Sequence, residues 1–407
     1  MKPTKDILIV DLAESAGGST ARAIDVAIES PAYNFYICTL HQLNKLYSRK
    51  TTSNIKKIRL FSFYNYPKKY SHTQILLKAT SNRILLFFGK KILALIDFAN
   101  EISLKTQLRF KLAGKNIDIV QANTGVHFLP YAIAKAKKAD LIYYFRHWDE
   151  YGWAQGKMLD SARLYLFVGV NLMNRFLKDL KLDLKRCHVI HSPFDATERR
   201  QQEPPLLDSD AALFKDKDRK TILSIGRICP QKGQHILLEA ITQLSVHCPR
   251  IKVIFVGAAG KSTTERNYER KLIDYVCANN LSDKVSFIGY RENPLKLLSF
   301  ANIAVQTPTY FEALAGSLVE ALQLGIATIS ADIGGANEAI IQNETGLLFP
   351  AGNSKALAEK IELLLTDDDL REKIAKNGQI YAINKWDKSS ICTKMHNAYN
   401  GSLTSIN

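Results

Sequence analysis

The chain has 407 residues, of which 46% are hydrophobic and 23% are charged. This composition is typical of a soluble globular protein, and the length predicts two domains of roughly 150–200 residues each. No run of 18 apolar residues is present, so no membrane-spanning helix is expected. The six cysteines form no C-x-x-C pair and the opening apolar run ILIV is short, so we expect a reducing, cytoplasmic location without a signal peptide.

The first half alternates between apolar strand patterns and helical patterns. The expected strands are DILIVDLA, FYICTL, IDIVQAN, LIYYF and the start of HVIHSPFD. Helical patterns follow two of them, in ARAIDVAIES and LPYAIAKAKKA. Strands that alternate with helices favour a parallel, doubly wound sheet. We therefore expect a Rossmann-like domain over residues 1–195.

Residues 196–219 contain Pro204-Pro205 and show no periodicity, so they are predicted to form a linker. A second α/β alternation then runs over 220–385, and a final helix in 386–407 is expected to cross back to the first domain. The expected strands of the second domain are KTILSIG, IKVIFVG, VSFIG, IAVQTP, ATISAD and GLLFP. The fold class is thus α/β, with two Rossmann-like domains that face a cleft.

The net charge of +16 is concentrated in one region of the first half. Between Lys45 and Lys115 there are 16 basic and two acidic residues, a net of 16 − 2 = +14, and they alternate with aromatic and aliphatic residues. This mixture suggests peripheral contact of 45–115 with anionic lipid on the inner face of a membrane. A solvated basic face remains an alternative. Nucleic acid is not expected, because no nucleic-acid-binding motif accompanies the charge.

The stretch YFEALAGSLVEALQLG holds Glu312 and Glu320, separated by seven residues. Ser317 is a possible N-cap, which would make Glu320 part of an S-x-x-E capping box. The alternative is functional: small residues before a helix N-terminus leave backbone N–H groups open to a phosphate. Two carboxylates beside it would then accept hydrogen bonds from sugar hydroxyls, which is the layout of a nucleotide sugar.

Two cations and a glycine pair are predicted at the same edge of the second sheet. Arg227 and Lys232 follow the strand KTILSIG, and either can bind phosphate. They could equally be solvated loop cations. Gly334-Gly335 follows the strand ATISAD and could be an ordinary turn.

The order R-x4-K-G, F-x-G, E-x7-E followed by LVEALQLG, GG-x-x-E and NETGLLFP resembles the retaining glycosyltransferases of the GT-B fold, family 4. The resemblance covers about residues 220–350. In the first half, AESAGGSTARAIDVA, FRHWDE and VIHSPFD are similar to the glycine loop, the His-Asp region and a strand end of that family.

The resemblance implies roles for individual residues. Glu320 would bind the donor ribose and Glu312 the donor sugar, while Arg227 and Lys232 would hold the pyrophosphate. Catalytic roles are thus implied for Glu312, Arg227, Lys232 and His147, the last lying near the sugar. Besides Glu320, the implied donor-binding positions are Gly316, Ser317, Leu318, Val319, Tyr290, Arg291, Gly17 and Gly18. Glu14 is a possible acceptor contact.

Two departures from the family pattern stand out. The usual E-G-F-G loop is Glu312-Ala313-Leu314-Ala315 here, whose methyl groups are expected to narrow the room beside the phosphate. The usual Asn-Gly pair is replaced by His191-Ser192-Pro193, so the asparagine's role is not transferred. His147 itself could be a structural histidine.

The resulting hypothesis is a metal-independent, retaining glycosyltransferase without a cofactor. Its partners would be a nucleotide sugar and a glycan or lipid-linked acceptor, in cell-surface polysaccharide or glycolipid synthesis. No His/Cys cluster has metal-ligand spacing, and Asp367-Asp368-Asp369 is expected to be solvated. The alternatives are a nucleotide-sugar epimerase on the same fold and a non-catalytic nucleotide- or glycan-binding protein.

Overall fold

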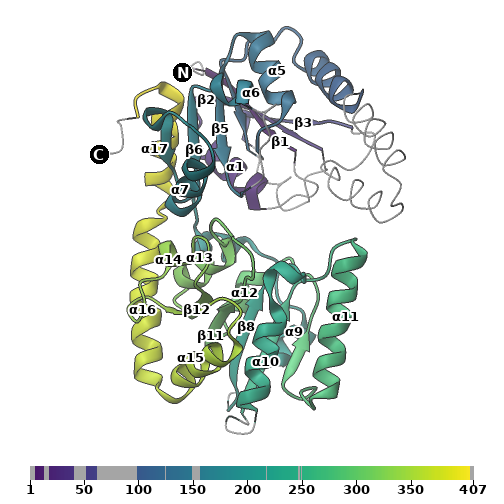
Figure 1. Cartoon of the computed structure of the whole chain (residues 1–407), viewed down its shortest axis with the longest axis vertical. Coiled ribbons are helices and arrows are strands. Elements are labelled where there is room, and N and C mark those ends of the chain that lie inside the picture. Colours follow the sequence, from purple (N-terminus) through teal and green to yellow (C-terminus); the bar gives the residue numbers. More distant parts are fainter. Residues whose placement is uncertain are drawn as a thin grey trace. The chain divides into compact units, whose positions relative to one another are not determined.

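The computed structural model describes residues 5–12, 18–40, 52–61, 99–123, 125–148, 156–216, 218–245, 248 and 250–403. The chain divides into two compact units (Figure 1). The N-terminal unit comprises Met1–Val168, Met173–Pro193 and Ser389–Asn407. The C-terminal unit comprises Gly169–Leu172 and Phe194–Lys388.

A parallel sheet forms the centre of the N-terminal unit, and its described strands run in the order β3-β2-β1-β4-β5-β6-β7. The strands are β1 (Lys5–Asp11), β2 (Tyr33–Thr39), β3 (Ile55–Arg59), β4 (Ile119–Ala122), β5 (Asp140–Phe145), β6 (Leu164–Phe167) and β7 (Cys187–Val189). The four residues 7–10 of β1 are at most 1% exposed, as expected for a central strand covered on both faces. Strands β3 and β6 were not among the expected strands; both are short, and three of the five residues of β3 are charged.

Helices from distant parts of the sequence cover this sheet. They include α1 (Gly18–Ile28), α5 (Phe128–Lys137), α6 (Gly156–Asp160), most of α7 (Val170–Asp179) and α17 (Lys388–Asn400). Helix α17 is held by the fully buried Tyr399, whose hydroxyl donates to Gln121 Oε1 at 2.9 Å. The Tyr399 ring also packs edge-on against Tyr33 and Phe35. The last helix is therefore part of the N-terminal core.

The C-terminal unit contains a second parallel sheet, in which the described strands run in the order β10-β9-β8-β11-β12-β13. They are β8 (Lys220–Ile225), β9 (Ile251–Val256), β10 (Val285–Phe287), β11 (Ile303–Gln306), β12 (Ala327–Ala331) and β13 (Leu347–Phe349). Each of these strands was expected from its apolar run. The order changes direction between β8 and β11, where ligands of open α/β sheets bind.

Alternate residues of each strand face opposite sides of the sheet and join different cores. Ile222 of β8 packs with α10 (Gln234–Leu244), α11 (Thr263–Ala278) and α15 (Ser354–Thr366). Its neighbour Leu223 packs with α12 (Pro294–Leu298) and α13 (Gly316–Gln323). Because both faces are covered, apolar residues are not confined to every second position of these strands. The remaining elements are the short α14 (Ala336–Ala339) and the long α16 (Asp368–Lys385).

Residues 196–219, expected to be a linker, carry structure and belong to the C-terminal unit. They contain α8 (Ala196–Gln202), α9 (Asp208–Ala211) and the 3₁₀ turn η3 (Ala212–Phe214). The side chain of Asp195 caps α8 by accepting the Glu198 amide at 2.8 Å. Asp195-Ala196-Thr197-Glu198 is thus a helix-start signature of the D-x-x-E type. The sequence analysis missed it because no longer apolar pattern follows it.

We predict that the N-terminal unit loses stability in mild acid. Burial lowers the pKa of His188 in β7 and of His396 in α17, whose Nε2 lies 2.5 Å from Ser30 Oγ. As the pH falls below about 6.5, the unfolded chain takes up protons at these histidines before the folded unit does. The free energy of unfolding therefore decreases through this window, until the pH passes the lowered folded-state pKa values.

Calorimetry from pH 7.5 to 5.5 measures this effect. His396→Gln keeps a hydrogen-bonding side chain next to Ser30 but removes one titrating group, so its unfolding temperature should change less with pH. Equal slopes for wild type and variant would contradict the prediction.

Candidate active site

The carboxyl edge of the C-terminal sheet brings together most of the predicted site residues. Because all paired strands are parallel, the loops that follow them meet at one edge. Arg227 and Lys232 follow β8, Glu312 follows β11, and Gly334-Gly335 follows β12. The sequence placed these residues on a common edge, and the structure confirms that placement.

Lys232 and Glu312 are in direct contact. Lys232 ends the 3₁₀ turn η4 (Pro230–Lys232), and its Nζ lies 2.6 Å and 2.8 Å from the two carboxylate oxygens of Glu312. The side chains are 24% and 30% exposed. A partly exposed ion pair of this kind contributes about 1 kcal/mol or less to the free energy of unfolding. Its main effect is therefore to fix where the ammonium and the carboxylate lie.

Threonines join the two loops that carry this ion pair. Thr307 Oγ1 donates to the carbonyl of Lys232 at 3.0 Å, and Thr309 Oγ1 donates to that of Pro230 at 2.9 Å. Gly233 has a φ of +64°, and a Cβ there would lie 2.0 Å from the Thr307 carbonyl oxygen. The loops after β8 and β11 therefore behave as one rigid surface.

The glycine pair after β12, Gly334-Gly335, packs directly against the backbone of the Glu312 loop. The Gly335 amide donates to the Glu312 carbonyl at 2.8 Å. A Cβ at Gly334 would lie 2.0 Å from Glu312 O, and one at Gly335 would lie 1.8 Å from Ala313 O. Ala313 and Ala315 are themselves buried. Their methyl groups therefore pack inside the protein, and the expectation that they narrow the room beside a phosphate stays a prediction.

Helix α13 begins earlier than the sequence suggested, and the predicted capping box is wrong. The N-cap is Ala315, in an extended conformation and without a side-chain cap. Ser317 is thus the second helical residue. Glu320 lies in the second turn, where its carboxylate pairs with Arg199 instead of capping the helix. No side chain closes this helix N-terminus because the cap position is an alanine.

The open N-terminus leaves backbone donors at the edge of the sheet. The amides of Leu318 and Val319 donate to the Ala315 carbonyl at 3.1 Å and 3.3 Å. Among the described residues, the amides of Gly316 and Ser317 have no hydrogen-bond acceptor. Uncapped amides together with the helix dipole form an anion-binding site. The resemblance implied that positions 316–319 bind the sugar donor, with amides near Leu318 and Val319 around the phosphate. Those two amides already have an acceptor, and the open amides are those of Gly316 and Ser317.

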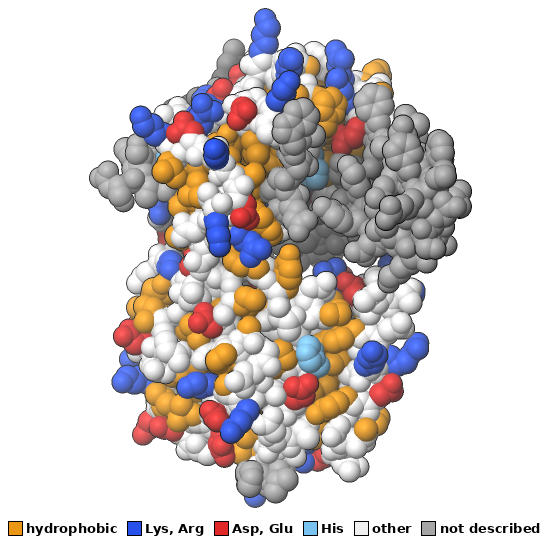
Figure 2. Space-filling view, in the orientation of Figure 1, with side chains coloured by type: hydrophobic (Ala, Val, Ile, Leu, Met, Phe, Trp, Pro, Cys, Tyr) orange, Lys and Arg blue, Asp and Glu red, His pale blue; other side chains and the backbone are white. Residues whose placement is uncertain are grey.

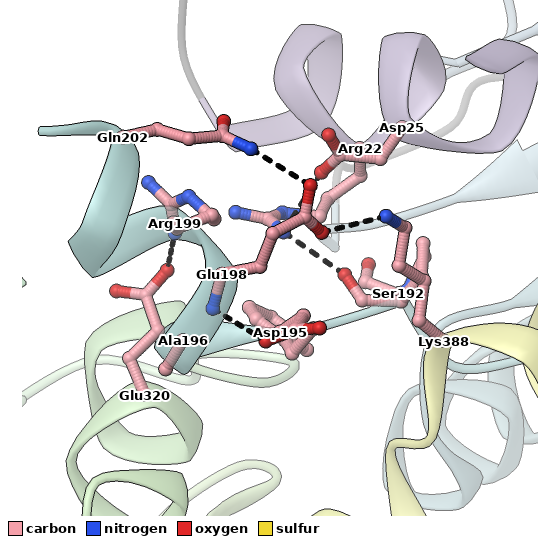
Figure 3. A network of polar contacts seen from close by, with 12 residues as sticks. Arg22, Asp25, Ser192, Asp195, Ala196, Glu198, Arg199, Gln202, Glu320 and Lys388 are labelled. Carbon is pink, nitrogen blue, oxygen red and sulfur yellow. Dashed lines mark hydrogen bonds and ion pairs between the residues drawn. The ribbon is translucent and has the colours of Figure 1, made fainter. Parts of the chain in front are cut away.

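Glu320 makes an ion pair with a residue that the sequence analysis missed. Arg199 Nη1, from α8, contacts Glu320 Oε1, as Figure 3 shows. The two side chains are 20% and 13% exposed, so water screens this pair less than a surface pair. Arg199 went unnoticed because it lies in the stretch interpreted as a linker.

The remaining predicted cation at this edge, Arg227, is more exposed. Its side chain is 63% exposed and its Nη1 lies 3.2 Å from Glu265 Oε1. Glu265, in the first turn of α11, also accepts the Gly260 amide at 2.7 Å. Arg227 therefore lies at the rim with a weak partner, which makes it available to another anion.

The turn after β10 holds Gly289, Tyr290 and Arg291, the three residues that the resemblance places near a nucleotide base. Gly289 has a φ of +73° and Tyr290 is exposed. The guanidinium of Arg291 donates to both carboxylate oxygens of the buried Asp210 of α9, from Nε at 2.6 Å and from Nη2 at 2.9 Å. These hydrogen bonds raise the pKa of the Arg291 guanidinium. The side chain of Arg291 thus ties α9 to the sheet, a role that sequence reasoning did not foresee.

The predicted residues of the N-terminal unit remain predictions. His147 is exposed in the loop after β5. Its neighbour Arg146 donates to Ser192 Oγ at 2.7 Å, which joins the FRHWDE and HSPFD segments at one sheet edge. Gly18 begins α1, whereas Gly17 and Glu14 lie outside the described residues.

The described residues contain no group of three or more His, Cys, Asp or Glu side chains that could hold a metal ion. In the triple-aspartate segment, Asp367 accepts the Leu370 amide at 2.8 Å and so caps α16. Asp368 pairs with Arg371 and Lys220, which lower its pKa. None of the described helices is long and apolar enough to cross a bilayer.

We predict that a methyl group at Gly334 is far more damaging than one at Gly352. Both residues are in the left-handed region, at φ of +64° and +83°, but only Gly334 meets another backbone. Gly352→Ala should cost about 1 kcal/mol for its backbone conformation alone. Gly334→Ala should cost about 1–3 kcal/mol more, because the Glu312 loop must move. Denaturant unfolding of the two variants measures the difference, and equal losses would contradict the close approach.

Comparisons with known proteins identify relatives of the region that carries this edge of the sheet. Residues 208–381 match the family model described as Glycosyl transferases group 1. The chain is 29% identical over 183 residues to the capsular polysaccharide biosynthesis glycosyltransferase CapM of Staphylococcus aureus, covering 45% of this chain and 46% of that protein. It is 28% identical over 208 residues to a Campylobacter jejuni enzyme, half of each chain being covered. That enzyme is named GalNAc-alpha-(1->4)-GalNAc-alpha-(1->3)-diNAcBac-PP-undecaprenol alpha-1,4-N-acetyl-D-galactosaminyltransferase. The chain spans about half the length of the curated relatives it matches.

Solved structures resemble the chain over nearly its whole length. HepE of Anabaena in complex with UDP has a TM-score of 0.76 and 19% identity, covering 98% of this chain and all of that one. A glycosyltransferase from Rickettsia africae has a TM-score of 0.77 and 18% identity, covering 99% of each chain. At these identities the similarity establishes the fold. Residues 208–381 thus match the family model of the group 1 glycosyltransferases, and the chain as a whole has the GT-B fold.

Proposed function

We propose that the protein is a retaining glycosyltransferase of family 4 that uses a nucleoside diphosphate sugar as donor. The observation that carries the proposal is the Lys232–Glu312 contact beside the open N-terminus of α13. A cation, two uncapped amides and two carboxylates lie at one sheet edge. This set matches a diphosphate flanked by the hydroxyl groups of a ribose and a sugar.

Each group has a chemical task in this proposal. Lys232, Arg227 and the amides of Gly316 and Ser317 bind the diphosphate and stabilise the negative charge that develops as it leaves. Glu312 accepts hydrogen bonds from the donor sugar, and Glu320 accepts them from the ribose. These tasks need no metal ion, because cationic side chains and the helix dipole already oppose the charge.

The proposed transfer retains the configuration of the anomeric carbon. The bond between that carbon and the phosphate oxygen breaks, and the acceptor hydroxyl forms its new bond on the same face. The proton of the acceptor moves to the departing phosphate oxygen. No nucleophile from the protein is required, and the nucleoside diphosphate leaves as product.

The relatives suggest classes of donor and acceptor. HepE has been solved with UDP-glucose, CapM is named for capsular polysaccharide biosynthesis, and the Campylobacter jejuni enzyme is named for an undecaprenol-linked acceptor. We therefore propose a glycan or lipid-linked acceptor in cell-surface polysaccharide or glycolipid assembly. UDP-sugars are the first donors to test.

An exposed basic and aromatic surface in the N-terminal unit supports the lipid-linked acceptor. In the described part of the basic stretch, Phe61 and Phe110 are 61% and 83% exposed. Gln107 joins their segments, because it binds the Phe61 amide and carbonyl at 2.9 Å and 2.8 Å. The exposed basic residues around them are Lys56, Lys57, Arg59, Arg109 and Lys111. On the face of the C-terminal unit in the lower part of Figure 2, by contrast, basic and acidic side chains are interspersed.

We predict that the diphosphate-binding residues control turnover. A thermal-shift panel of nucleoside diphosphate sugars should identify a donor, since a ligand at a hundredfold excess over its Kd stabilises by about 2.7 kcal/mol. With that donor, Lys232→Met should lower kcat about a hundredfold to a thousandfold, because it removes one stabiliser of the leaving group. Glu312→Gln and Glu320→Gln should also lower turnover. Arg270→Met, exposed on α11, serves as the control and should leave turnover unchanged.

Three outcomes would overturn this proposal. Unchanged turnover in both Glu312→Gln and Glu320→Gln would show that these glutamates are not part of the active site. A free epimerised nucleotide sugar formed without an acceptor would indicate an epimerase instead. Nucleotide binding without either transfer or donor hydrolysis would indicate a binding protein.

We predict that the protein floats with anionic liposomes at low salt and is released as salt rises. Electrostatic attraction contributes about 1 kcal/mol to the free energy of membrane binding for each basic residue near an anionic surface. Phe61→Ser with Phe110→Ser should weaken flotation, whereas Ile380→Ser, at an exposed apolar residue of the C-terminal unit, should not. Wild-type protein that ignores phosphatidylserine vesicles at low salt would contradict the membrane contact.

A further inference from the structure

Helices α8 and α13 are aligned by one buried side chain. Gln323, which is 4% exposed, accepts the Ala196 amide through Oε1 at 3.0 Å. Its Nε2 donates to the Phe194 carbonyl, also at 3.0 Å. One amide group therefore binds the backbone on both sides of the α8 N-cap. This pairing allows the two helices little freedom to slide along each other.

The alignment brings Arg199 to Glu320. Arg199 lies one turn after Ala196 on α8, and Glu320 lies one turn before Gln323 on α13. Ala196 contacts Gln323 and Arg199 contacts Glu320, so the two helices pair in opposite directions over this turn. Figure 3 shows Arg199 pointing at Glu320, and the two side chains form an ion pair.

The opposite side of α8 is held as well. Glu198, next to Arg199, accepts Gln202 Nε2 and Lys388 Nζ, each at 2.8 Å. The N-cap bond from the Glu198 amide to Asp195 fixes the first turn of the helix. Arg199 therefore projects from a short helix whose position is determined by several independent contacts.

We propose that Arg199 is a positioning residue for nucleotide recognition: it holds the Glu320 carboxylate in the orientation that receives the ribose hydroxyls. This inference rests on the proposed function, in which Glu320 binds the ribose. A glutamate side chain has three rotatable bonds, and a nucleotide that had to order them would bind more weakly. The ion pair orders them in advance.

A carboxylate that pairs with an arginine can also accept hydrogen bonds from ligand hydroxyls. An ionised carboxylate offers about four lone-pair sites on its two oxygens. The guanidinium contacts Oε1 through Nη1. A fork of N–H donors and a pair of vicinal hydroxyls can therefore bind one carboxylate at different lone pairs.

The test compares a ribonucleotide with an analogue that lacks the hydroxyls. UDP and 2′,3′-dideoxy-UDP are titrated by calorimetry against wild type, Glu320→Ala, Arg199→Met and Arg199→Lys; if UDP does not bind, the tightest diphosphate of the donor panel replaces it. Wild type should prefer the ribose form about tenfold or more, the value of a hydrogen bond to a charged group. Glu320→Ala should abolish this preference, Arg199→Met should remove most of it, and Arg199→Lys should restore part. Affinity for the dideoxy analogue should be nearly equal in all four proteins.

Arg200→Met is the matched control. Arg200 is the next residue of the same helix, and within the described part of the chain it has no ion-pair partner. The ribose preference of the Arg200→Met variant should equal that of wild type. A folding defect would weaken both nucleotides alike, so the ratio of the two affinities separates positioning from stability.

The failure of this inference is distinguishable from that of the proposed function. If Glu320→Ala loses the ribose preference but Arg199→Met keeps it, Arg199 does not position Glu320, while the donor site stands. If Arg199→Met binds UDP more tightly, Arg199 competes with the ribose, and the inference is wrong. If wild type binds no nucleoside diphosphate or shows no ribose preference, the proposed function and the inference fail together.

Discussion

The candidate site depends on the close contact between two backbone segments at the carboxyl edge of the C-terminal sheet. The Glu312–Ala313 loop rests directly on Gly334-Gly335, at a separation that excludes any side chain on the glycines. This contact sets the height of the loop above the sheet, and the loop in turn sets where α13 begins. The position of the open amides and the side of the helix that Glu320 presents to α8 both follow from it. Since backbone atoms carry the contact, the geometry depends little on side-chain rotamers.

Every charged side chain proposed to bind the donor already has a partner of opposite charge. The pairs are Lys232 with Glu312, Glu320 with Arg199, and Arg227 with Glu265. Such pairing limits the cost of keeping carboxylates and cations together in a partly buried place. Under the proposed function, a nucleotide would therefore enter a site of paired, nearly neutral groups. Its binding would exchange partners at the exposed pairs, above all at Arg227, rather than order loose side chains.

The strands of the C-terminal unit and the shared sheet edge could be predicted from the sequence, because buried parallel strands are continuous apolar runs and parallel pairing places their ends together. The linker and the capping box could not. Residues 196–219 show no apolar periodicity, and polar contacts help to hold them in place, Gln323 with the backbone of Ala196 and Arg291 with Asp210. Helix α13 starts at Gly316 because the loop's contact with the glycine pair determines its first turn, a non-local effect that no spacing within the helix reveals. The contact of Arg199 with Glu320 depends on the alignment of two helices more than a hundred positions apart in the chain. A single sequence does not contain that information.

The attachment of α17 to the N-terminal unit has a consequence for how the chain is made. Tyr399 fills the core beside Tyr33 and Phe35, yet it is synthesised after the entire C-terminal unit. While the ribosome is still translating, the N-terminal sheet lacks a buried side chain and the hydrogen-bond partner of Gln121. The C-terminal sheet, whose strands and helices are contiguous in sequence from Lys220 onward, can finish folding first. The first domain to be synthesised is thus the last to be completed.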